Sequence, residues 1–298
     1  IEVLCPNDEN YPQRLRECPD APIVLYKQGN VNLNKHRTLN IIGTRNCTQY
    51  GRDLIRAFIR ELKSICPDAL VFSGLAYGID ICAHRESLVN NMETVGVVAH
   101  GLDIVYPRMH TETAKEMCQK GGDVITEYTT NTQPMPKNFV QRNRIVAGCT
   151  DATLLVESAN KGGGLITCNI ARSYNREVFA FPGALGAEYS EGCNQLIRDN
   201  GASLITSAYD FVKAMNWDND IKLEKAQQQG IERTLFPNLN SEEQTVVEAL
   251  QQQNDQQINM LSVRTNLSMA RLMALLFELE MKGIIRTMAG GCYHLLEV

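Results

Sequence analysis

The sequence predicts a doubly wound parallel α/β sheet followed by a small C-terminal winged-helix domain. Three observations support this prediction. Over residues 36–216, short β-branched and aliphatic runs alternate with amphipathic stretches of helical length. A polar segment that includes three consecutive glutamines then predicts a linker over residues 217–239. Order resumes over residues 240–298, in a pattern of three helices and a hairpin.

The elements of the large domain are assigned from this alternation. The predicted strands cover residues 38–43, 69–73, 94–99, 122–127, 152–157, 178–181 and 202–205. The predicted helices cover residues 51–63, 79–90, 110–120, 138–147, 165–174, 192–199 and 207–215. Residues 1–35 are expected to form an irregular lead-in with one short strand. Because the chain begins with Ile1, an upstream module is expected to be absent. Ligands of such sheets bind outside the carboxyl ends of the strands, so the loops there are the candidate sites.

Capping residues and a turn mark the elements of the C-terminal domain. Ser241 and Gln244 fit a capping box that begins the first helix, and a second helix is predicted over 258–265. Ser268 begins the third helix, and Gly283 is its expected C-cap. One apolar stripe marks that third helix: Leu272, Leu275, Leu276 and Leu279. Two short strands, 284–287 and 293–296, flank the turn Ala289-Gly290-Gly291, which completes a winged helix.

Composition limits the possible functions. The 298 residues carry a net charge of −5, which argues against a generally basic nucleic-acid coat protein, so any nucleic-acid site must be a local patch. Ten cysteines without a C-x-x-C pair argue against zinc and are expected to be mostly free core thiols in a reducing cytosol. No apolar run reaches membrane-spanning length, and no signal peptide opens the chain. These features predict a cytoplasmic protein with no membrane association.

Several loops after the predicted strands carry polar groups. Gly43-Thr44-Arg45 suits a phosphate, although alone it is better explained as an ordinary turn with a solvated arginine. Asp80 and His84 share one helix face at i and i+4, and a buried hydrogen bond that holds the loop is preferred over a catalytic or metal pair. His100 could act as a general base, but without a nucleophile to serve it is interpreted as structural.

The segment 137–176 is locally basic, with six cations against Asp151 and Glu157, a net charge of +4. It begins with Lys137-Asn138-Phe139-Val140-Gln141-Arg142-Asn143-Arg144, where an aromatic ring lies among cations. That arrangement suits bases stacked over a charged groove. The alternative is a helix with Phe139 in the core and its arginines paired with acids, and composition alone leaves the two even.

The turn Lys161-Gly162-Gly163-Gly164 precedes a predicted helix. Glycines at a helix N-terminus expose backbone N–H groups to an anion, aided by the helix dipole. The turn is not a Walker A loop, because no Gly-Lys-Ser/Thr follows at the required spacing. Anion binding is therefore preferred here over a plain flexible turn.

Taken together, these motifs resemble the DprA/Smf family of DNA-processing proteins over roughly residues 10–215. The motifs shared with the family, in chain order, are Tyr11-Pro12, Leu25-Tyr26 with Gly29, Gly43-Thr44-Arg45 with Tyr50-Gly51, Ser73-Gly74-Leu75-Ala76 with Gly78-Ile79-Asp80 and Ala83-His84, Gly101-Leu102-Asp103 with Tyr106-Pro107, Phe139-Val140-Gln141-Arg142-Asn143-Arg144, Glu157, Gly164 with Ile166-Thr167 and Ala171, Pro182-Gly183, Gly192-Cys193-Asn194 with Leu196-Ile197, and Gly201-Ala202. Thr44 stands where the family usually has Ser, and Lys161-Gly162-Gly163 replaces its usual Ser-Gly approach to the helix.

The resemblance implies a Rossmann-like domain that binds single-stranded DNA, forms a homodimer and helps to load RecA recombinase during natural transformation. It implies no catalysis, cofactor or metal. The DNA-binding residues carried over are Gly43, Thr44, Arg45, Arg108, Lys137, Phe139, Arg142, Asn143, Arg144, Gly162, Gly163 and Gly164. The cations among them would neutralise phosphates, the glycine N–H groups would bind one more phosphate, and Phe139 would stack on a base. The winged helix, with four cations and seven acids over 240–298, is not expected to read duplex DNA strongly.

Two other functions are compatible with a Rossmann-like fold. The first is a LOG-type phosphoribohydrolase, whose glycine-rich turn is followed closely by a Glu. Here Leu165-Ile166-Thr167 follow the glycines, which argues against that enzyme. The second is a nucleotide-sensing module that places a free nucleotide in the same phosphate loops.

Overall fold

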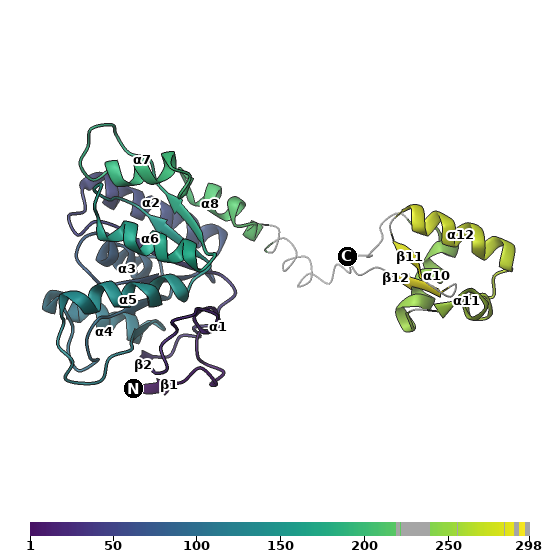
Figure 1. The fold of residues 1–298 in the computed structure, drawn as a ribbon, viewed down its shortest axis with the longest axis horizontal. Coiled ribbons are helices and arrows are strands. Elements are labelled where there is room, and N and C mark those ends of the chain that lie inside the picture. Colours follow the sequence, from purple (N-terminus) through teal and green to yellow (C-terminus); the bar gives the residue numbers. More distant parts are fainter. Residues whose placement is uncertain (219–220, 222–238, 255, 283, 289–291, 296–298) are drawn as a thin grey trace. The chain divides into compact units, whose positions relative to one another are not determined.

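The computed structural model describes residues 1–218, 221, 239–254, 256–282, 284–288 and 292–295. The chain divides into two compact units, Ile1–Ile221 and Lys222–Val298, shown as ribbons in Figure 1. We call them unit 1 and unit 2 and describe each by itself.

Unit 1 is built on a nine-stranded sheet in the order β1-β2-β6-β5-β4-β3-β7-β8-β9. The strands from β3 to β9 are all parallel, and the order reverses on either side of β3. Their bounds are β1 Glu2–Leu4, β2 Leu25–Gly29, β3 Thr38–Ile42, β4 Leu70–Ser73, β5 Thr94–Val97, β6 Asp123–Thr126, β7 Ala152–Leu155, β8 Glu177–Ala180 and β9 Ser203–Leu204. This is the predicted doubly wound, Rossmann-like sheet.

Helices cover both faces of this sheet, as Figure 1 shows. Their bounds are α1 Gln13–Arg16, α2 Gln49–Ile65, α3 Ile79–Val89, η1 Arg108–His110, α4 Thr111–Gln119, α5 Pro136–Gly148, α6 Gly163–Ser173, α7 Glu191–Arg198 and α8 Ala208–Ala214. Each face of the sheet has its own hydrophobic core, because successive side chains of a strand point to opposite faces. In β4, Leu70 and Phe72 pack in the core under α5 and α6, whereas Val71 packs in the core under α2 and α3. Burial on both faces explains why the strands read as continuous apolar runs.

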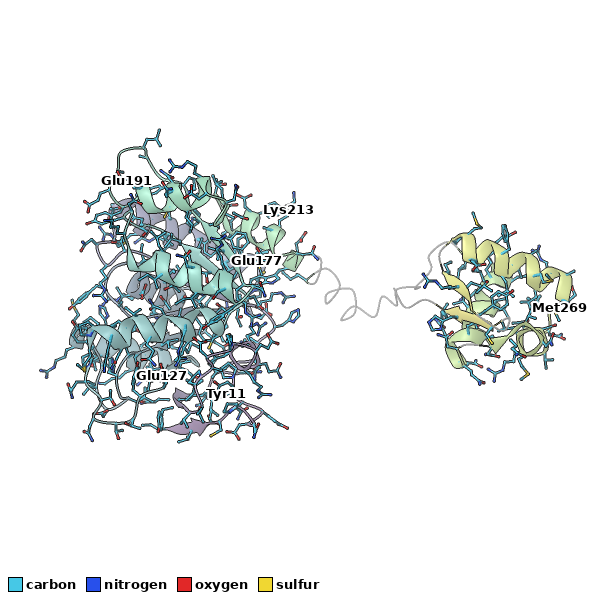
Figure 2. All side chains as sticks on the ribbon, in the orientation of Figure 1. Tyr11, Glu127, Glu177, Glu191, Lys213 and Met269 are labelled. Carbon is cyan, nitrogen blue, oxygen red and sulfur yellow. The ribbon has the colours of Figure 1, made fainter. Side chains whose placement is uncertain are left out.

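The N-terminal segment differs from the predicted irregular lead-in with one strand. It contributes two strands, because β2 pairs antiparallel with β6 and β1 pairs antiparallel with β2. Between them Tyr11, labelled in Figure 2, is fully buried, and its hydroxyl donates to the Pro22 carbonyl at 2.7 Å. The N-terminal residues therefore form one edge of the sheet. Their strands are short, so the sequence shows little of the alternation that would predict them.

Trp217 is another departure, since the sequence places it at the start of the linker. In the structure it is buried and packs edge-to-face on Phe211 of α8, with ring centroids 5.2 Å apart. A single aromatic residue at the edge of a polar stretch gives no periodicity, so composition assigned it wrongly. The glutamine run 227–229 of the predicted linker lies outside the described residues.

Unit 2 has the predicted winged-helix pattern. Its elements are α10 Ser241–Gln252, β10 Gln256–Gln257, α11 Ile258–Thr265, α12 Met269–Met281, β11 Ile285–Met288 and β12 Cys292–Leu295, with the strands in the order β10-β12-β11. The capping box lies one residue earlier than predicted. Asn240, not Ser241, accepts the N–H of Glu243 at 2.8 Å, and the Glu243 carboxylate accepts the Asn240 N–H. Ser268 does cap α12, whereas Gly283 and the predicted turn at 289–291 lie outside the described residues.

Candidate nucleic-acid interface

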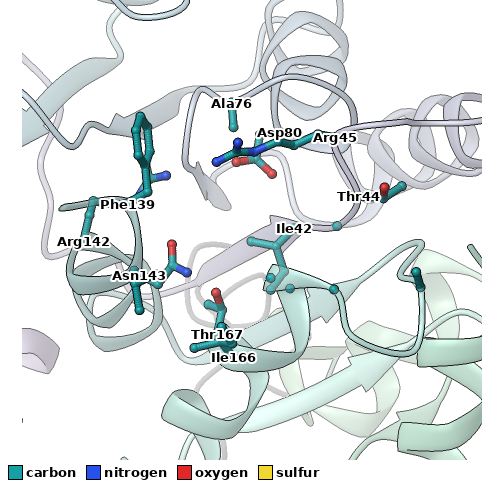
Figure 3. A pocket seen from close by; sticks show the side chains of 16 residues that line it. Ile42, Thr44, Arg45, Ala76, Asp80, Phe139, Arg142, Asn143, Ile166 and Thr167 are labelled. Atoms are coloured by element: carbon teal, nitrogen blue, oxygen red, sulfur yellow. The ribbon is translucent and has the colours of Figure 1, made fainter. Parts of the chain in front are cut away.

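A pocket of about 340 Å³ lies at the carboxyl edge of the sheet, where the strand order reverses between β3 and β7. Figure 3 shows the side chains that converge on it from the loop after β3, the start of α3, the first turns of α5 and the start of α6. Nine of the twelve predicted DNA-binding residues line it: Gly43, Thr44, Arg45, Phe139, Arg142, Asn143, Gly162, Gly163 and Gly164. The sequence thus located the pocket, because parallel strands bring loops distant in the chain to one edge.

Arg45 and Phe139 form the cationic and aromatic side of this pocket. Arg45 is exposed, and its guanidinium carbon lies 5.4 Å from the centre of the Phe139 ring. The ring is half-buried and also contacts Tyr106, with centroids 5.7 Å apart. A guanidinium held over a ring leaves its N–H donors free to reach a phosphate, while the remaining ring surface is available to a base.

Arg142 is a correction to the predicted set of phosphate contacts. It borders the pocket but is only 4% exposed, and its guanidinium donates to the carbonyls of Gly74, at 2.6 Å, and Val97. Its counter-charge is Asp80, which is also buried. Burial lowers the pKa of Arg142 to about 10 and raises the pKa of Asp80. The guanidinium is therefore committed to holding β4, β5 and α5 together.

Gly74 makes this arrangement possible. A Cβ at that position would lie 2.6 Å from the Asp80 carboxylate and 2.7 Å from the Arg142 guanidinium, so only glycine lets both groups approach. Asp80 is buried against the loop that precedes α3, where the backbone of Ala76 and Gly74 opposes the rise of its pKa. The Nδ1 of His84 lies 2.7 Å from the Thr94 hydroxyl. Both side chains thus have buried structural partners outside their own helix, which agrees with the loop-holding role preferred from the sequence.

The remaining predicted cations lie outside the pocket lining. Arg144 forms a partly buried ion pair with Glu127, which is labelled in Figure 2, so its charge is largely balanced within the protein. Lys137 and Arg108 are both exposed, one at the start of α5 and the other at the start of η1. Much of the +4 charge predicted for 137–176 is thus neutralised internally, including Arg176, which pairs with Glu17 at 3.0 Å.

The three glycines before α6 have different roles. A Cβ on Gly164 would lie 2.7 Å from the Leu155 side chain, and one on Gly162 would lie 2.2 Å from the Ser158 hydroxyl, so both positions are closely packed. Gly163 faces open space. It is the first residue of α6, after an N-cap that has no side-chain hydrogen bond, and the first N–H groups of a helix have no partner within it. The anion-binding prediction therefore rests on Gly163.

Sequence reasoning missed most of the apolar lining. Val140, Ile166 and Thr167 border the pocket and belong to motifs shared with the family, but they were not named as binding residues. Ile42 and Ala159 also border it and belong to no such motif. His100 has the structural role preferred from the sequence: its Nε2 accepts the Tyr106 N–H at 3.1 Å, and its Nδ1 lies 2.9 Å from the Gly101 carbonyl. Burial lowers its pKa, and because Nε2 accepts a hydrogen bond, that nitrogen carries no proton.

The cations of α12 and its C-cap, Arg271 and Lys282, form ion pairs within unit 2. Arg271, on α12, lies 2.6 Å from Glu242, and Lys282 lies 2.6 Å from Glu243. The outer surface of α12 instead carries exposed apolar side chains at every fourth position: Met269, Met273, Phe277 and Met281. The helix that would enter a major groove therefore lacks the positive surface that approach to phosphates requires.

The described residues contain no group of three or more His, Cys, Asp or Glu side chains arranged to hold a metal ion. Within the same residues, no helix is both long and apolar enough to cross a bilayer.

The fold and this site define a class: an α/β protein with a pocket at the switch point of its sheet that presents an exposed arginine, followed by a winged helix. The chain matches the family described as DNA recombination-mediator protein A over residues 2–216, and the DprA winged helix domain over residues 233–291. It therefore belongs to the DprA/Smf family.

Curated relatives agree with this assignment. The DNA processing protein DprA of Streptococcus pneumoniae is 37% identical over 207 residues, which are 69% of this chain and 71% of that protein. DprA of Bacillus subtilis is 36% identical over 217 residues, 72% of this chain and 71% of that protein.

Solved structures of the family are also similar. The Streptococcus pneumoniae DprA structure has a TM-score of 0.65 at 35% identity and covers 72% of this chain and 73% of its own. The Helicobacter pylori DprA structure, described for its single-stranded DNA binding mode, has a TM-score of 0.65 at 28% identity and covers 73% of this chain and 96% of its own.

Proposed function

We propose that this protein binds single-stranded DNA through the pocket at the switch point. The observation that carries the proposal is the Arg45–Phe139 pair, in which an exposed guanidinium lies 5.4 Å from the centre of a half-buried ring. A nucleotide has a phosphate for the guanidinium and a base for the ring. The helix N-terminus at Gly163 offers N–H groups to a second phosphate.

The pocket favours a single strand over a duplex for a geometric reason. Stacking on Phe139 requires a base with a free face, and in a duplex both faces are covered by neighbouring bases. The Helicobacter pylori relative is described as binding single-stranded DNA, and the shared fold supports the same ligand here.

At the level of the cell, we propose a cytoplasmic recombination mediator that acts as a homodimer and helps to load RecA recombinase on incoming DNA. Family membership supports this role. Binding rather than turnover is proposed because Asp80, the one carboxylate in the pocket lining, is buried against Arg142. The burial of Asp80 against Arg142 also argues against a phosphoribohydrolase, which needs an available acid. Hydrolysis of AMP by this protein would instead support that enzyme.

The test is a binding titration of the full chain against labelled oligo-dT and a duplex of equal length. A clear preference for oligo-dT is expected, and ATP should compete poorly because it supplies one base and no continuing strand. Equal affinity for both DNA forms would refute the proposal. Displacement of oligo-dT by millimolar ATP would indicate instead a nucleotide-sensing site.

A further inference from the structure

A second pocket, of about 460 Å³, lies in unit 1 beside the candidate DNA site. Three motifs that the DNA site leaves unused meet there: Tyr50-Gly51 in the first turn of α2, Glu157 after β7 and Pro182-Gly183 after β8. Because these segments follow parallel strands, the pocket lies at the same carboxyl edge of the sheet. We call it the tyrosine pocket, after Tyr50 and Tyr189 in its lining.

The two tyrosine rings are held in place by their hydroxyl groups. The Tyr50 hydroxyl donates to the Pro182 carbonyl at 2.7 Å, although 47% of this residue is exposed. The Tyr189 hydroxyl accepts from the Asn46 amide at 3.0 Å, and its ring is half-buried. Rings fixed in this way form a preorganised surface on which a flat group can stack.

The tyrosine pocket also contains a buried acid. Glu157 is only 3% exposed, and its carboxylate accepts the Thr48 N–H at 2.9 Å and the Thr48 hydroxyl. A Cβ on Gly51 would lie 2.1 Å from this carboxylate, so only glycine lets the first turn of α2 close over it. A carboxylate has about four acceptor positions, and Thr48 occupies two of them. Glu157 therefore retains acceptor capacity toward a ligand in the pocket.

The charges of the lining select the kind of ligand. Among the described residues that line the tyrosine pocket, the charged ones are Glu157 and Glu188, both acids. They repel a phosphate and attract a group with N–H donors. A flat group with N–H donors describes a nucleobase that carries an exocyclic amino group. Cytosine presents an amine at the position where thymine presents a carbonyl oxygen, which a carboxylate would repel.

The tyrosine pocket and the DNA site share a wall. Thr44 lines the DNA site, and its backbone N–H donates at 2.8 Å to the carbonyl of Glu157, whose side chain lines the tyrosine pocket. The loop between β3 and α2 continues this wall, from Arg45 on one side to Thr48 on the other. One strand of DNA thus meets a cation for its phosphate and, past the wall, an acid and two rings for a base.

We propose that the tyrosine pocket is a nucleobase subsite of the DNA site, selective for bases that carry an exocyclic amino group. A phosphate binds at Arg45, and a neighbouring base enters the tyrosine pocket, stacks on Tyr50 and donates its amine to Glu157. The inference rests on the proposed function, because it assumes that a single strand binds at Arg45. It adds a base preference to a site whose phosphate contacts alone would be indifferent to sequence.

The experiment compares the affinities of the full chain for oligo-dC and oligo-dT of equal length, at equal salt. A mildly alkaline buffer keeps cytosine neutral, so that the oligo-dC strands do not pair with one another. Oligo-dC should bind about five- to tenfold more tightly, which is at the lower end of what a base-edge contact supplies.

Variants locate the source of the preference. Glu157→Gln should abolish it, because the new amide group repels the cytosine amine and donates to the thymine carbonyl. Tyr50→Ala should reduce it by removing the stacking surface, whereas Tyr50→Phe keeps the ring and should keep the preference. Glu191→Gln is the charge control, since Glu191, labelled in Figure 2, is exposed at the start of α7 and outside the lining.

The outcomes separate this inference from the proposed function. Equal affinities for oligo-dC and oligo-dT overturn the subsite, leave DNA binding intact, and favour a guanidinium or ammonium group as the occupant of the pocket. A preference that survives in both Glu157→Gln and Tyr50→Ala, or that is lost in Glu191→Gln, also overturns it. Displacement of oligo-dC by millimolar deoxycytidine would show a site for free nucleosides instead. If neither strand binds, the proposed function itself fails, and the subsite with it.

Discussion

Replacing Arg45 by alanine tests the electrostatic part of the proposed DNA site. The charged residues in the pocket lining are Arg45, Arg142 and Asp80, and the last two are buried together, so Arg45→Ala removes its net charge. A hydrogen bond to a charged group contributes about 1.5–3 kcal/mol, which corresponds to a loss of about 10- to 150-fold in affinity at low salt. The free energy of unfolding should be unchanged in Arg45→Ala, because Arg45 is exposed.

The salt dependence gives the sharper test. Each phosphate neutralised on a single strand contributes about −0.7 to the slope of log affinity against log salt concentration. With Arg45, Arg108 and Lys137 as the exposed cations of the predicted set, the wild-type slope should be about −2, and that of Arg45→Ala about 0.7 shallower. Between about 50 and 200 mM salt, the deficit of the variant should therefore shrink about 2.6-fold.

Fluorescence anisotropy with labelled oligo-dT at several KCl concentrations measures both quantities. Arg45→Lys should keep the slope but lose affinity, since lysine lacks the planar fork. Arg56→Ala is the matched control, because Arg56 is 58% exposed on α2 and forms only surface ion pairs. If the Arg45→Ala and wild-type lines are parallel, or if the Arg56 control loses as much affinity, Arg45 does not contact a phosphate.

Four further predictions follow from the same structure. Phe139→Ala should cost about 1–3 kcal/mol in oligo-dT binding; a fall in melting temperature with unchanged affinity would instead make the ring a core residue. Asp80→Asn should lower the free energy of unfolding by about 3 kcal/mol, measured by urea titration, because it leaves Arg142 buried without its counter-charge. Burial lowers the pKa of His84 to about 3, so as pH falls below about 6.5 this side chain is protonated in the unfolded chain but not in the folded one, and the free energy of unfolding decreases. His84→Gln should reduce the slope of the free energy of unfolding against pH by up to about 1.4 kcal/mol per pH unit. Equal slopes for the variant and the wild type would refute the lowered pKa of His84. Deleting residues 225–298 should change oligo-dT affinity only a few-fold, and a hundredfold loss in a folded, dimeric truncation would make unit 2 a DNA-binding element.

The sequence predicted the fold because strong periodic signals specify it. The parallel strands are apolar on both faces, as Leu70, Val71 and Phe72 show, and such runs are readable without knowing their partners. The N-terminal strands were harder, because β1 has three residues and two of them are exposed. The capping box was misplaced by one residue because Asn240 and Ser241 are both good caps, and only geometry distinguishes them.

The sequence predicted which loops meet at the candidate site, but not which of their side chains are available to a ligand. Topology brings the loops after parallel strands to one edge, so Arg45 and Phe139 could be expected together. Residue type could not show that Arg142 and Arg144 are bound to groups within the protein, because those groups lie on distant segments of the chain. Arg142 donates to the Gly74 carbonyl, and Arg144 pairs with Glu127. Exposure, which decides whether an arginine meets a phosphate, depends on tertiary contacts that a single sequence does not display.

The antiparallel edge formed by β1 and β2 affects the order in which the chain can fold during synthesis. β2 pairs with β6 in a register that joins Tyr26 to Thr126, so the partner strand emerges about 100 residues later. At about 5–20 residues per second, β2 waits about 5–20 s for this partner strand. During that time Leu4 and Leu25, both fully packed in the finished core, have no sheet to cover them. β1 and β2 are thus fixed later than their position in the chain suggests, because they cannot join the sheet before residue 126 has been made.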